Sequence, residues 1–512
     1  MAKIERTKNA TRNVIYGFIL KAYTLFVPFL MRTAVIYFLG IQYLGLSSLF
    51  SSVLQVLNLA ELGVGSAMVF SMYKPIAEDD TVTICALMKL YKIYYRIIGV
   101  IIASLGILLT PFIPKLISGA IPDDINIYIL YYLNLGATVL SYWLFAYKNS
   151  ILMAHQRTDI ASKVTLATTT FQYIFQIGVL WYFRNYYYYV IITLVTQVLT
   201  NIMTAIYANK LYPNYKPIGK LEKNDVKEIN QRIKDLFTAK LGTVLGTSVN
   251  SIVISANLGL SVLAVFHNYY CIINAIIGFI QIIFTSIRAG IGNSLIIDNA
   301  EKNYNDFNKL VFMILWIVTV SAACFATTCQ PFMQLWVGKR LLLPNYMVGL
   351  FCIMLFLMVI QNLSCAYKDA AGIWHEDRFR PLVTVVVNLI LNIIFVRLWG
   401  LQGVIIAMIF PYLFIAMPWV VHNLFKFVFK RKANVYILKI VKGFFLFCII
   451  ISLCHIACTY IFISTNGLLR LIVNFVISIC FSNMLLTVFN KNDVVFYQVI
   501  NLLKRITSIS KI

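Results

Sequence analysis

Charged side chains are rare inside the apolar stretches of this sequence, and the few that occur could bind ions. The basic ones are Lys21, Arg32, Lys240 and Arg288, and the single carboxylate is Glu61. A charge inside a membrane is costly unless it is paired or faces a wet cavity, so such residues mark candidate binding sites. Because the cations outnumber the carboxylate, the sequence predicts a basic cavity with an anionic ligand. We expect binding rather than catalysis, with no catalytic residue, cofactor or metal site.

The composition around these residues is that of a multi-pass membrane protein. Of 512 residues, 60% are apolar and 12% are charged, and a soluble protein of this length could not bury so much apolar surface. A spanning helix needs roughly 20 apolar residues. About fourteen segments meet this requirement: 13–39, 42–72, 94–114, 127–147, 161–183, 187–208, 238–257, 261–287, 309–335, 346–367, 382–399, 401–421, 440–463 and 468–489. We therefore expect an all-α membrane protein.

The basic residues predict how these helices are oriented. The formal net charge is +24, from 43 Lys and Arg against 19 Asp and Glu. The few basic residues in the expected outer loops are Lys115, Arg184, Lys339, Arg340, Arg397 and Arg470. Most of the others lie in inner loops, tails and adjoining helix ends, as the positive-inside rule describes. Attraction to anionic lipid explains this charge without nucleic acid. Both termini and the loop 209–237 are expected in the cytoplasm.

An internal repeat divides the chain into two halves. Ala146-Tyr147-Lys148 recurs 220 residues later as Ala366-Tyr367-Lys368, and Leu39-Gly40 recurs as Leu258-Gly259. Each half holds six helices, so both have the same orientation, as in transporters built from parallel repeats. The predicted organisation is an N-terminal six-helix bundle at 1–208, a cytoplasmic linker at 209–237, a C-terminal bundle at 238–425, and two additional helices with a tail at 426–512. Such halves suit alternating access.

Polar residues form stripes on the first two helices of each half. On the second, seventh and eighth helices the candidate polar or ion-coupling residues are Asn58, Glu61, Asn250, His267, Asn274 and Gln281. A polar stripe facing lipid is costly, so these stripes are expected to face a central cavity. Any single amide or hydroxyl among them could instead serve hydrogen bonding between helices.

Glu61 and Lys21 are expected at the same depth in the membrane. The first two helices join at a tight turn near Gly40 to Gln42, and the two charges lie nineteen residues from it on either side. A rise of about 1.5 Å per residue then places them level, and an ion pair would lower the cost of burying both. Two interpretations stay open: a purely structural pair, or a site that takes up a coupling cation, proton or sodium.

Several stretches resemble a known family. They are RTAVIYFLGIQYLGLSSLF (32–50), AELGVGSAMVFSMYKPIAEDD (60–80), AYKDAAGIWHEDRFRPLVTVVVNLILNI (366–393) and GLQGVII (400–406). Together they are similar to the bacterial oligosaccharide-lipid flippases of the multidrug/oligosaccharidyl-lipid/polysaccharide exporter superfamily. The resemblance implies two six-helix bundles around a V-shaped cavity, plus two extra helices. It also implies transport of undecaprenyl-diphosphate-linked repeat units of O-antigen or capsule across the bacterial plasma membrane, from the inner to the outer leaflet.

The resemblance is incomplete at the seventh helix. Related sequences often read T-D-N-I-x-I-S there, whereas this chain has no carboxylate between Ser248 and Ser255. That difference argues against cation coupling through this helix. The expected partners are a lipid-linked oligosaccharide, membrane lipid and a coupling cation, with no nucleic acid, and the chain is expected to be a monomer.

Two other functions compete with the flippase. A cation-coupled multidrug exporter would share the fold, but cationic drugs favour acidic cavity walls. A membrane enzyme, such as a glycan polymerase or a glycosyltransferase, would need a large outer loop with acids and bases. The longest outer loop here is short, near 115–126, so we do not expect an enzyme.

Labelling of a cysteine tests the topology. In a chain whose ten cysteines are replaced, Lys220→Cys should react with a membrane-impermeant maleimide only after the inner face is opened, because the positive-inside rule places 209–237 there. Labelling of this position in intact cells would contradict the orientation.

Overall fold

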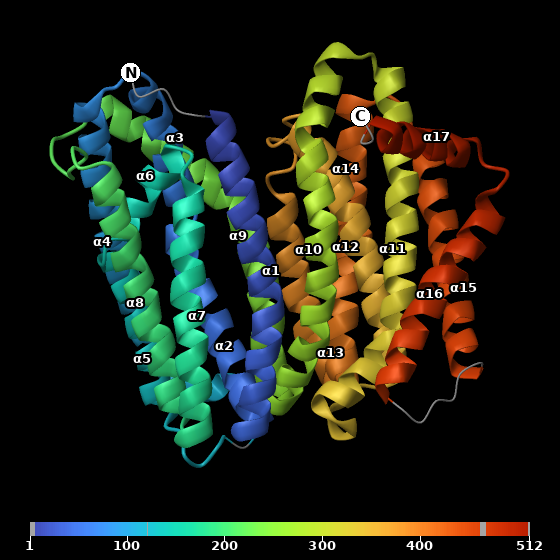
Figure 1. Cartoon of the computed structure of the whole chain (residues 1–512), viewed down its shortest axis with the longest axis horizontal. Coiled ribbons are helices and arrows are strands. Elements are labelled where there is room, and N and C mark those ends of the chain that lie inside the picture. The colour runs from blue at the N-terminus through green and yellow to red at the C-terminus, as the bar shows by residue number, and fades with distance from the viewer. Residues whose placement is uncertain (1–5, 120, 461–466, 510–512) are drawn as a thin grey trace. The chain divides into compact units, whose positions relative to one another are not determined.

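The computed structural model describes residues 6–119, 121–460 and 467–509, and in these ranges the chain forms helices and turns without a strand. The chain divides into two compact units, Met1–Ala264 and Val265–Ile512. Figure 1 labels the helices of both. The predicted class, an all-α protein with many membrane-length helices, is confirmed.

Each expected apolar segment coincides with helical structure, although fewer helices pass a strict test for spanning. Ten helices of the described residues are long and apolar enough to cross a membrane, or up to eleven if a bent pair is one span. The sequence predicted about fourteen spans. Part of the difference arises because Arg380–Val428 is one span by this test, although it contains two of the expected segments. Gly400, with φ 58° and ψ −136°, interrupts this stretch where the sequence divides it. Another part comes from the seventh segment, whose apolar helix Val244–Leu258 is short.

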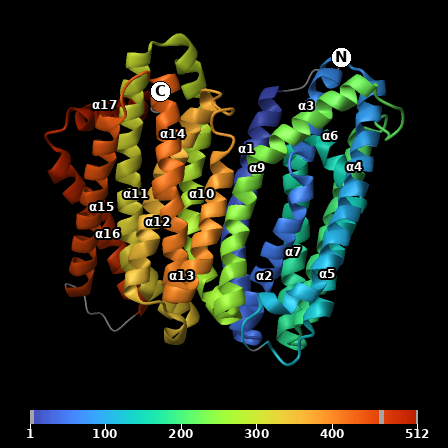
Figure 2. The same ribbon diagram turned by 180° about the vertical axis from the view of Figure 1, so that it is seen from behind.

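The first unit is a bundle of helices joined by short turns. Its helices are α1 (Arg6–Phe38), α2 (Ile41–Leu57), η1 (Asn58–Glu61), α3 (Val64–Ala77), α4 (Thr81–Leu109), η2 (Thr110–Leu116), α5 (Ile127–Trp143), η3 (Ala146–Lys148), α6 (Asn149–Ala154), α7 (Thr158–Tyr182), α8 (Tyr186–Leu211) and α9 (Lys223–Leu258). Helix α7 packs against both α1 and α8, and α4 packs against α3 and α5 (Figure 1). Helix α9, which the sequence repeat places in the second half, packs against α2 and α3 of this unit (Figure 2).

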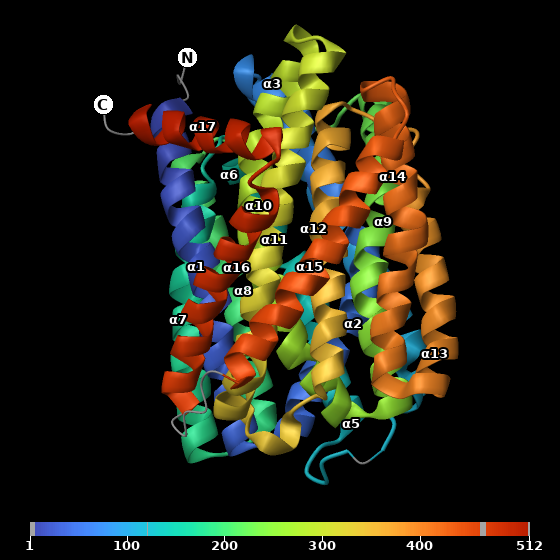
Figure 3. The same cartoon turned by 90° about the vertical axis from the view of Figure 1, so that its right-hand side faces the viewer.

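The second unit is arranged around one long helix. Its helices are α10 (Leu260–Ile297, whose first residues belong to the first unit), α11 (Ala300–Val337), η4 (Lys339–Leu341), α12 (Asn345–Ala370), α13 (Arg380–Pro411), the π-helical turns η5 (Tyr412–Ala416) and η6 (Leu424–Val428), α14 (Met417–Asn423), α15 (Asn434–Tyr460), α16 (Gly467–Asn490) and α17 (Val494–Ile509). Helix α11 contacts α12, α15 and α16. Helix α17 lies across the ends of α15 and α16 (Figure 3), and its Phe496 ring stacks on Trp316 of α11.

The repeat is visible in the backbone at two equivalent turns. Gly40, between α1 and α2, has φ 119° and ψ 169°, and Gly259, between α9 and α10, has φ 88° and ψ 172°. This region of the backbone map is accessible almost only to glycine. The shared Leu-Gly pair therefore makes the same sharp turn at the start of each half.

The halves differ in where their helices are broken. In the first unit the second helix is interrupted by η1, and the pair Ile127–Trp143 and Ala146–Ala154 is bent by 48°. The positions 220 residues further on, 278–283 and 364–368, lie inside the continuous helices α10 and α12. Two broken helices thus distinguish the first half from the second.

Candidate functional site

Glu61 ends the short 3₁₀ turn η1, at the interruption of the second helix. Leu62 follows with extended ψ, and Gly63 then takes a left-handed conformation with φ 90° before α3 begins. A Cβ at Gly63 would also lie 2.9 Å from the carbonyl oxygen of Ile233 in α9. Only glycine satisfies both the dihedral angle and this close approach. The sequence Glu-Leu-Gly therefore ends one helix and starts another, with the carboxylate at the junction.

Two tyrosines hold the Glu61 carboxylate. The Tyr95 hydroxyl of α4 donates to Oε1 at 2.7 Å, and the Tyr142 hydroxyl of α5 donates to Oε2 at 2.6 Å. Tyr91, one turn before Tyr95, donates to the Tyr95 hydroxyl at 2.6 Å. Oxygen–oxygen distances of about 2.5–2.7 Å are typical of a hydroxyl bonded to a charged carboxylate. The cluster Glu61, Tyr91, Tyr95 and Tyr142 is called the Glu61 cluster below.

The Glu61 cluster also lies beside the bend that follows α5, which is the second helix interruption of the first unit. Tyr142 is one residue before the end of α5, and Phe145 then has a left-handed φ of 61°. Such a conformation is strained for a bulky residue and persists only where surrounding contacts maintain it. One carboxylate therefore connects the broken second helix, α4 and the bend after α5.

The expected ion pair between Glu61 and Lys21 is not formed in the described part of the chain. Both Glu61 oxygens are occupied by tyrosine hydroxyls, and the Lys21 side chain is exposed. Lys21 and Glu61 would lie at equal depth only if the second helix were continuous, with about 1.5 Å rise per residue. The 3₁₀ turn and Gly63 break that continuity, and α4 and α5 supply other partners for the carboxylate.

The other candidate cations have different surroundings. Arg32 of α1 is half-buried, and its charge acts on Tyr189 of α8. Lys240 falls in α9, but its side chain lies outside the described residues. Arg288 of α10 pairs with Asp369 at 3.6 Å. Glu61 is therefore not the one carboxylate available to these cations, because Asp369, at the end of α12, pairs with Arg288.

The polar-stripe candidates lie in varied environments. Asn58 and Gln281 are half-buried, and Asn274 is exposed. Asn250 is buried and donates to the Gly246 carbonyl. His267 contacts the rings of Phe266 and Tyr270. Two of the helices that carry stripes are in contact, since Ser248 of α9 donates to the Gln55 amide oxygen of α2 at 3.0 Å. The convergence of all the stripes on one central cavity stays a prediction.

A buried ionic cluster in the second unit was missed by the sequence analysis. Asp377 is 3% exposed and receives two hydrogen bonds from the Arg380 guanidinium, at 2.6 and 2.9 Å, and one from Lys368 at 3.0 Å. In the first unit Lys148, the repeat equivalent of Lys368, is also buried and donates to Asn209 at 2.6 Å. The repeated Ala-Tyr-Lys motif was the sequence feature that could have indicated these sites, because its lysine is buried in each half.

Removal of one tyrosine hydroxyl tests the Glu61 cluster. Tyr142→Phe should lower the free energy of unfolding by about 1.5–3 kcal/mol, the usual contribution of a hydrogen bond to a charged group. The matched control is Tyr132→Phe, which changes an exposed tyrosine of the same helix. Thermal unfolding of the purified protein in detergent would measure both. Equal midpoints for the two variants would show that the Glu61 hydrogen bonds do not stabilise the unit.

Comparison with known proteins supports the fold. No family model and no curated protein matches the chain. Among solved structures, the lipid II flippase MurJ in an inward closed conformation matches with TM-score 0.67 and 14% identity, over 94% of this chain and 98% of that one. An inward-facing MATE family multidrug resistance transporter of the MOP superfamily matches with TM-score 0.63 and 16% identity, over 82% and 98%.

A third structure is a MOP superfamily transporter from Pyrococcus furiosus described as having a binding pocket of reversed polarity. It matches with TM-score 0.52 and 14% identity, over 82% of this chain and 95% of that one. Identities this low establish shared architecture rather than shared substrate. The chain therefore has the fold of the multi-pass flippases and transporters of the MOP superfamily.

Proposed function

We propose that the protein is a flippase that moves undecaprenyl-diphosphate-linked oligosaccharide repeat units from the inner to the outer leaflet by alternating access. Its products would enter O-antigen or capsule assembly in the bacterial plasma membrane. The observation that carries the proposal is the basic character of α1, which holds Lys21 and Arg32 in an apolar span. The Glu61 carboxylate is bound by Tyr95 and Tyr142 and not by Lys21. A diphosphate is an anion that such cations can bind.

The share of the chain that is matched also supports the proposal. The MurJ match covers 94% of this chain, whereas the MATE match covers 82%. The broader coverage favours the protein named as a lipid flippase.

A cation-coupled multidrug exporter is the alternative, supported by the TM-score of 0.63 with a MATE transporter. Cationic drugs would be repelled by Lys21 and Arg32, so the basic span favours the flippase over this alternative.

We further propose that the Glu61 cluster couples transport to a proton or sodium ion. An ionised carboxylate accepts from both Tyr95 and Tyr142. Protonation turns one oxygen into a donor, so one tyrosine must then reorient or lose its partner. A bound sodium ion would compete for the same oxygens. Either event would loosen the contact between the two helix interruptions, which is a physical route from ion binding to helix movement.

Substitution of Arg32 tests the substrate contact. In proteoliposomes with a fluorescent undecaprenyl-diphosphate glycan, Arg32→Gln should lower the flipping rate at least about tenfold, as expected for loss of a charged hydrogen bond. Arg32→Lys should keep part of the activity because the charge remains. Arg397→Gln, at an exposed position of α13, is the control.

Two results would contradict this assignment. If Arg32→Gln reduces the folded protein as much as it reduces flipping, the residue is structural. Transport of a cationic dye, without flipping of the glycan lipid, would favour the exporter.

Substitution of Glu61 tests the coupling. Glu61→Gln should abolish acceleration of flipping by an imposed proton or sodium gradient while leaving slow exchange without a gradient, because the amide cannot gain or lose a charge. The control is Glu78→Gln, an exposed carboxylate beside Lys74. An unchanged response to both gradients in Glu61→Gln would assign Glu61 a purely structural role.

A further inference from the structure

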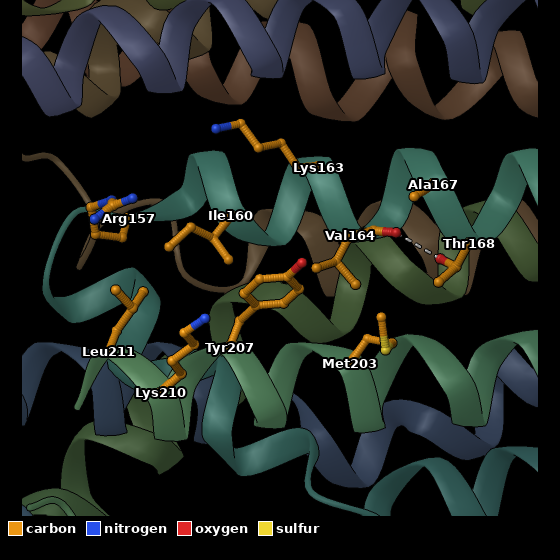
Figure 4. A pocket seen from close by; sticks show the side chains of 10 residues that line it. All are labelled: Arg157, Ile160, Lys163, Val164, Ala167, Thr168, Met203, Tyr207, Lys210 and Leu211. Carbon is orange, nitrogen blue, oxygen red and sulfur yellow. Dashed lines mark hydrogen bonds between the residues drawn. The ribbon is translucent and has the colours of Figure 1, made fainter. Parts of the chain in front are cut away.

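A groove between α7 and α8 lies apart from the Glu61 cluster. It has a volume of about 590 Å³, within the range of small-ligand sites. Figure 4 shows its lining, which consists of Arg157, Ile160, Lys163, Val164, Ala167, Thr168, Met203, Tyr207, Lys210 and Leu211. The groove belongs entirely to the first unit, and none of its residues is among the transport candidates.

Three cations lie toward one end of the groove. They are Arg157 at the start of α7, Lys210 at the end of α8, and Lys163, whose side chain extends from the side of α7 that faces away from Lys210 (Figure 4). The carboxylate of Asp159 is fully buried beside them and pairs with Arg157 at 2.9 Å and with Lys163 at 3.5 Å. No carboxylate of the described residues pairs with Lys210, which is exposed. One acid against three cations leaves this end of the groove positive.

This basic end is held in place by its neighbours. Asn13 of α1 accepts from the Asp159 backbone N–H at 2.8 Å and donates to the Gln156 carbonyl at 2.9 Å. The Lys163 ammonium lies 4.1 Å from the centre of the Tyr16 ring. Burial alone would raise the pKa of Asp159, but Arg157 and Lys163 hold this pKa below its usual value. Asp159 therefore stays ionised and fixes Arg157 at the rim.

The rest of the groove is mostly apolar. Ile160, Val164 and Met203 form its walls beyond the cations (Figure 4). Two hydroxyls also line this part: that of Thr168 already donates to the Val164 carbonyl at 2.9 Å, and that of Tyr207 points toward Val164 (Figure 4). A free phosphate ion would use only the basic end. A molecule with an anionic head and a hydrocarbon chain would use both parts.

We propose that this groove binds one anionic phospholipid of the membrane leaflet at this end of the bundle. Its phosphate would lie between Arg157 and Lys210, with Lys163 adding positive charge nearby, and an acyl chain would lie along Ile160, Val164 and Met203. Lysine and arginine near a membrane surface attract anionic headgroups, and burial of an acyl chain against apolar walls strengthens binding further. The volume suits a headgroup and the first part of a chain rather than an oligosaccharide. The proposal does not rest on the proposed transport function.

Lipid retention by the purified full chain tests the groove. The protein would be reconstituted in phosphatidylcholine nanodiscs containing a small fraction of phosphatidylglycerol, and native mass spectrometry would measure retained phosphatidylglycerol. Lys210→Gln should weaken retention about fivefold, as expected for one basic residue at a membrane surface. Ala167→Phe should abolish retention by filling the groove while every cation remains.

Two control variants separate the groove from general effects. Lys220→Gln removes an exposed lysine from the loop after α8, and Ile174→Phe enlarges an exposed residue of α7 outside the groove. Both should retain phosphatidylglycerol as the unchanged protein does. The same pattern should appear in thermal stabilisation by phosphatidylglycerol relative to phosphatidylcholine.

Three results would overturn the proposal. Retention unchanged in both Lys210→Gln and Ala167→Phe would place the lipid elsewhere. Equal thermal stabilisation by inorganic phosphate would show that the basic end binds an anion without a chain. Displacement of phosphatidylglycerol by an equimolar amount of undecaprenyl diphosphate would make the groove a substrate site rather than a phospholipid site.

Discussion

The hydrogen bonds that Tyr95 and Tyr142 donate to Glu61 maintain the geometry of the first unit. In hydrocarbon a helix is the favoured backbone structure because it satisfies its own polar groups, and an interruption is tolerated only where the protein supplies partners. Here two interruptions lie in one unit, one at Glu61 and the other just after Tyr142. Each charged hydrogen bond contributes about 1.5–3 kcal/mol. The same carboxylate therefore connects the two helix interruptions and is the group to which the proposed ion coupling is assigned.

The two halves share a repeat but use it differently. The turns at Gly40 and Gly259 have nearly the same backbone dihedral angles. The buried lysines Lys148 and Lys368 occupy equivalent places, yet the first meets the amide of Asn209 and the second meets Asp377. The second half has continuous helices α10 and α12 and a buried ionic cluster at the end of α12, whereas the equivalent helices of the first half are broken around the half-buried Glu61. This asymmetry supports the proposal that ion coupling belongs to the first half.

Positive charge serves more than one purpose in this chain. Excess lysine and arginine in the expected inner loops predict the orientation of the chain in the membrane. Cations within the apolar span of α1 are suited to a lipid-linked anion in transit. The basic end of the α7–α8 groove would hold a resident lipid. In each case a cation lies beside apolar surface, which favours an anion attached to hydrocarbon over a soluble one.

The helical class, the apolar segments, the repeat and the charged residues within apolar stretches could all be predicted from the amino-acid sequence, because they depend on local composition and periodicity. Gly40, Gly259 and Gly400 were found at helix ends for the same reason. The sequence did not determine the partners of these residues. Glu61 meets Tyr95 and Tyr142 rather than Lys21, and Arg288 meets Asp369, because helices distant in sequence supply these groups. The 3₁₀ turn that ends at Glu61 and the left-handed Gly63 change the direction of the second helix. The partners of Glu61 therefore depend on how α4 and α5 pack against this turn, which local sequence patterns do not specify.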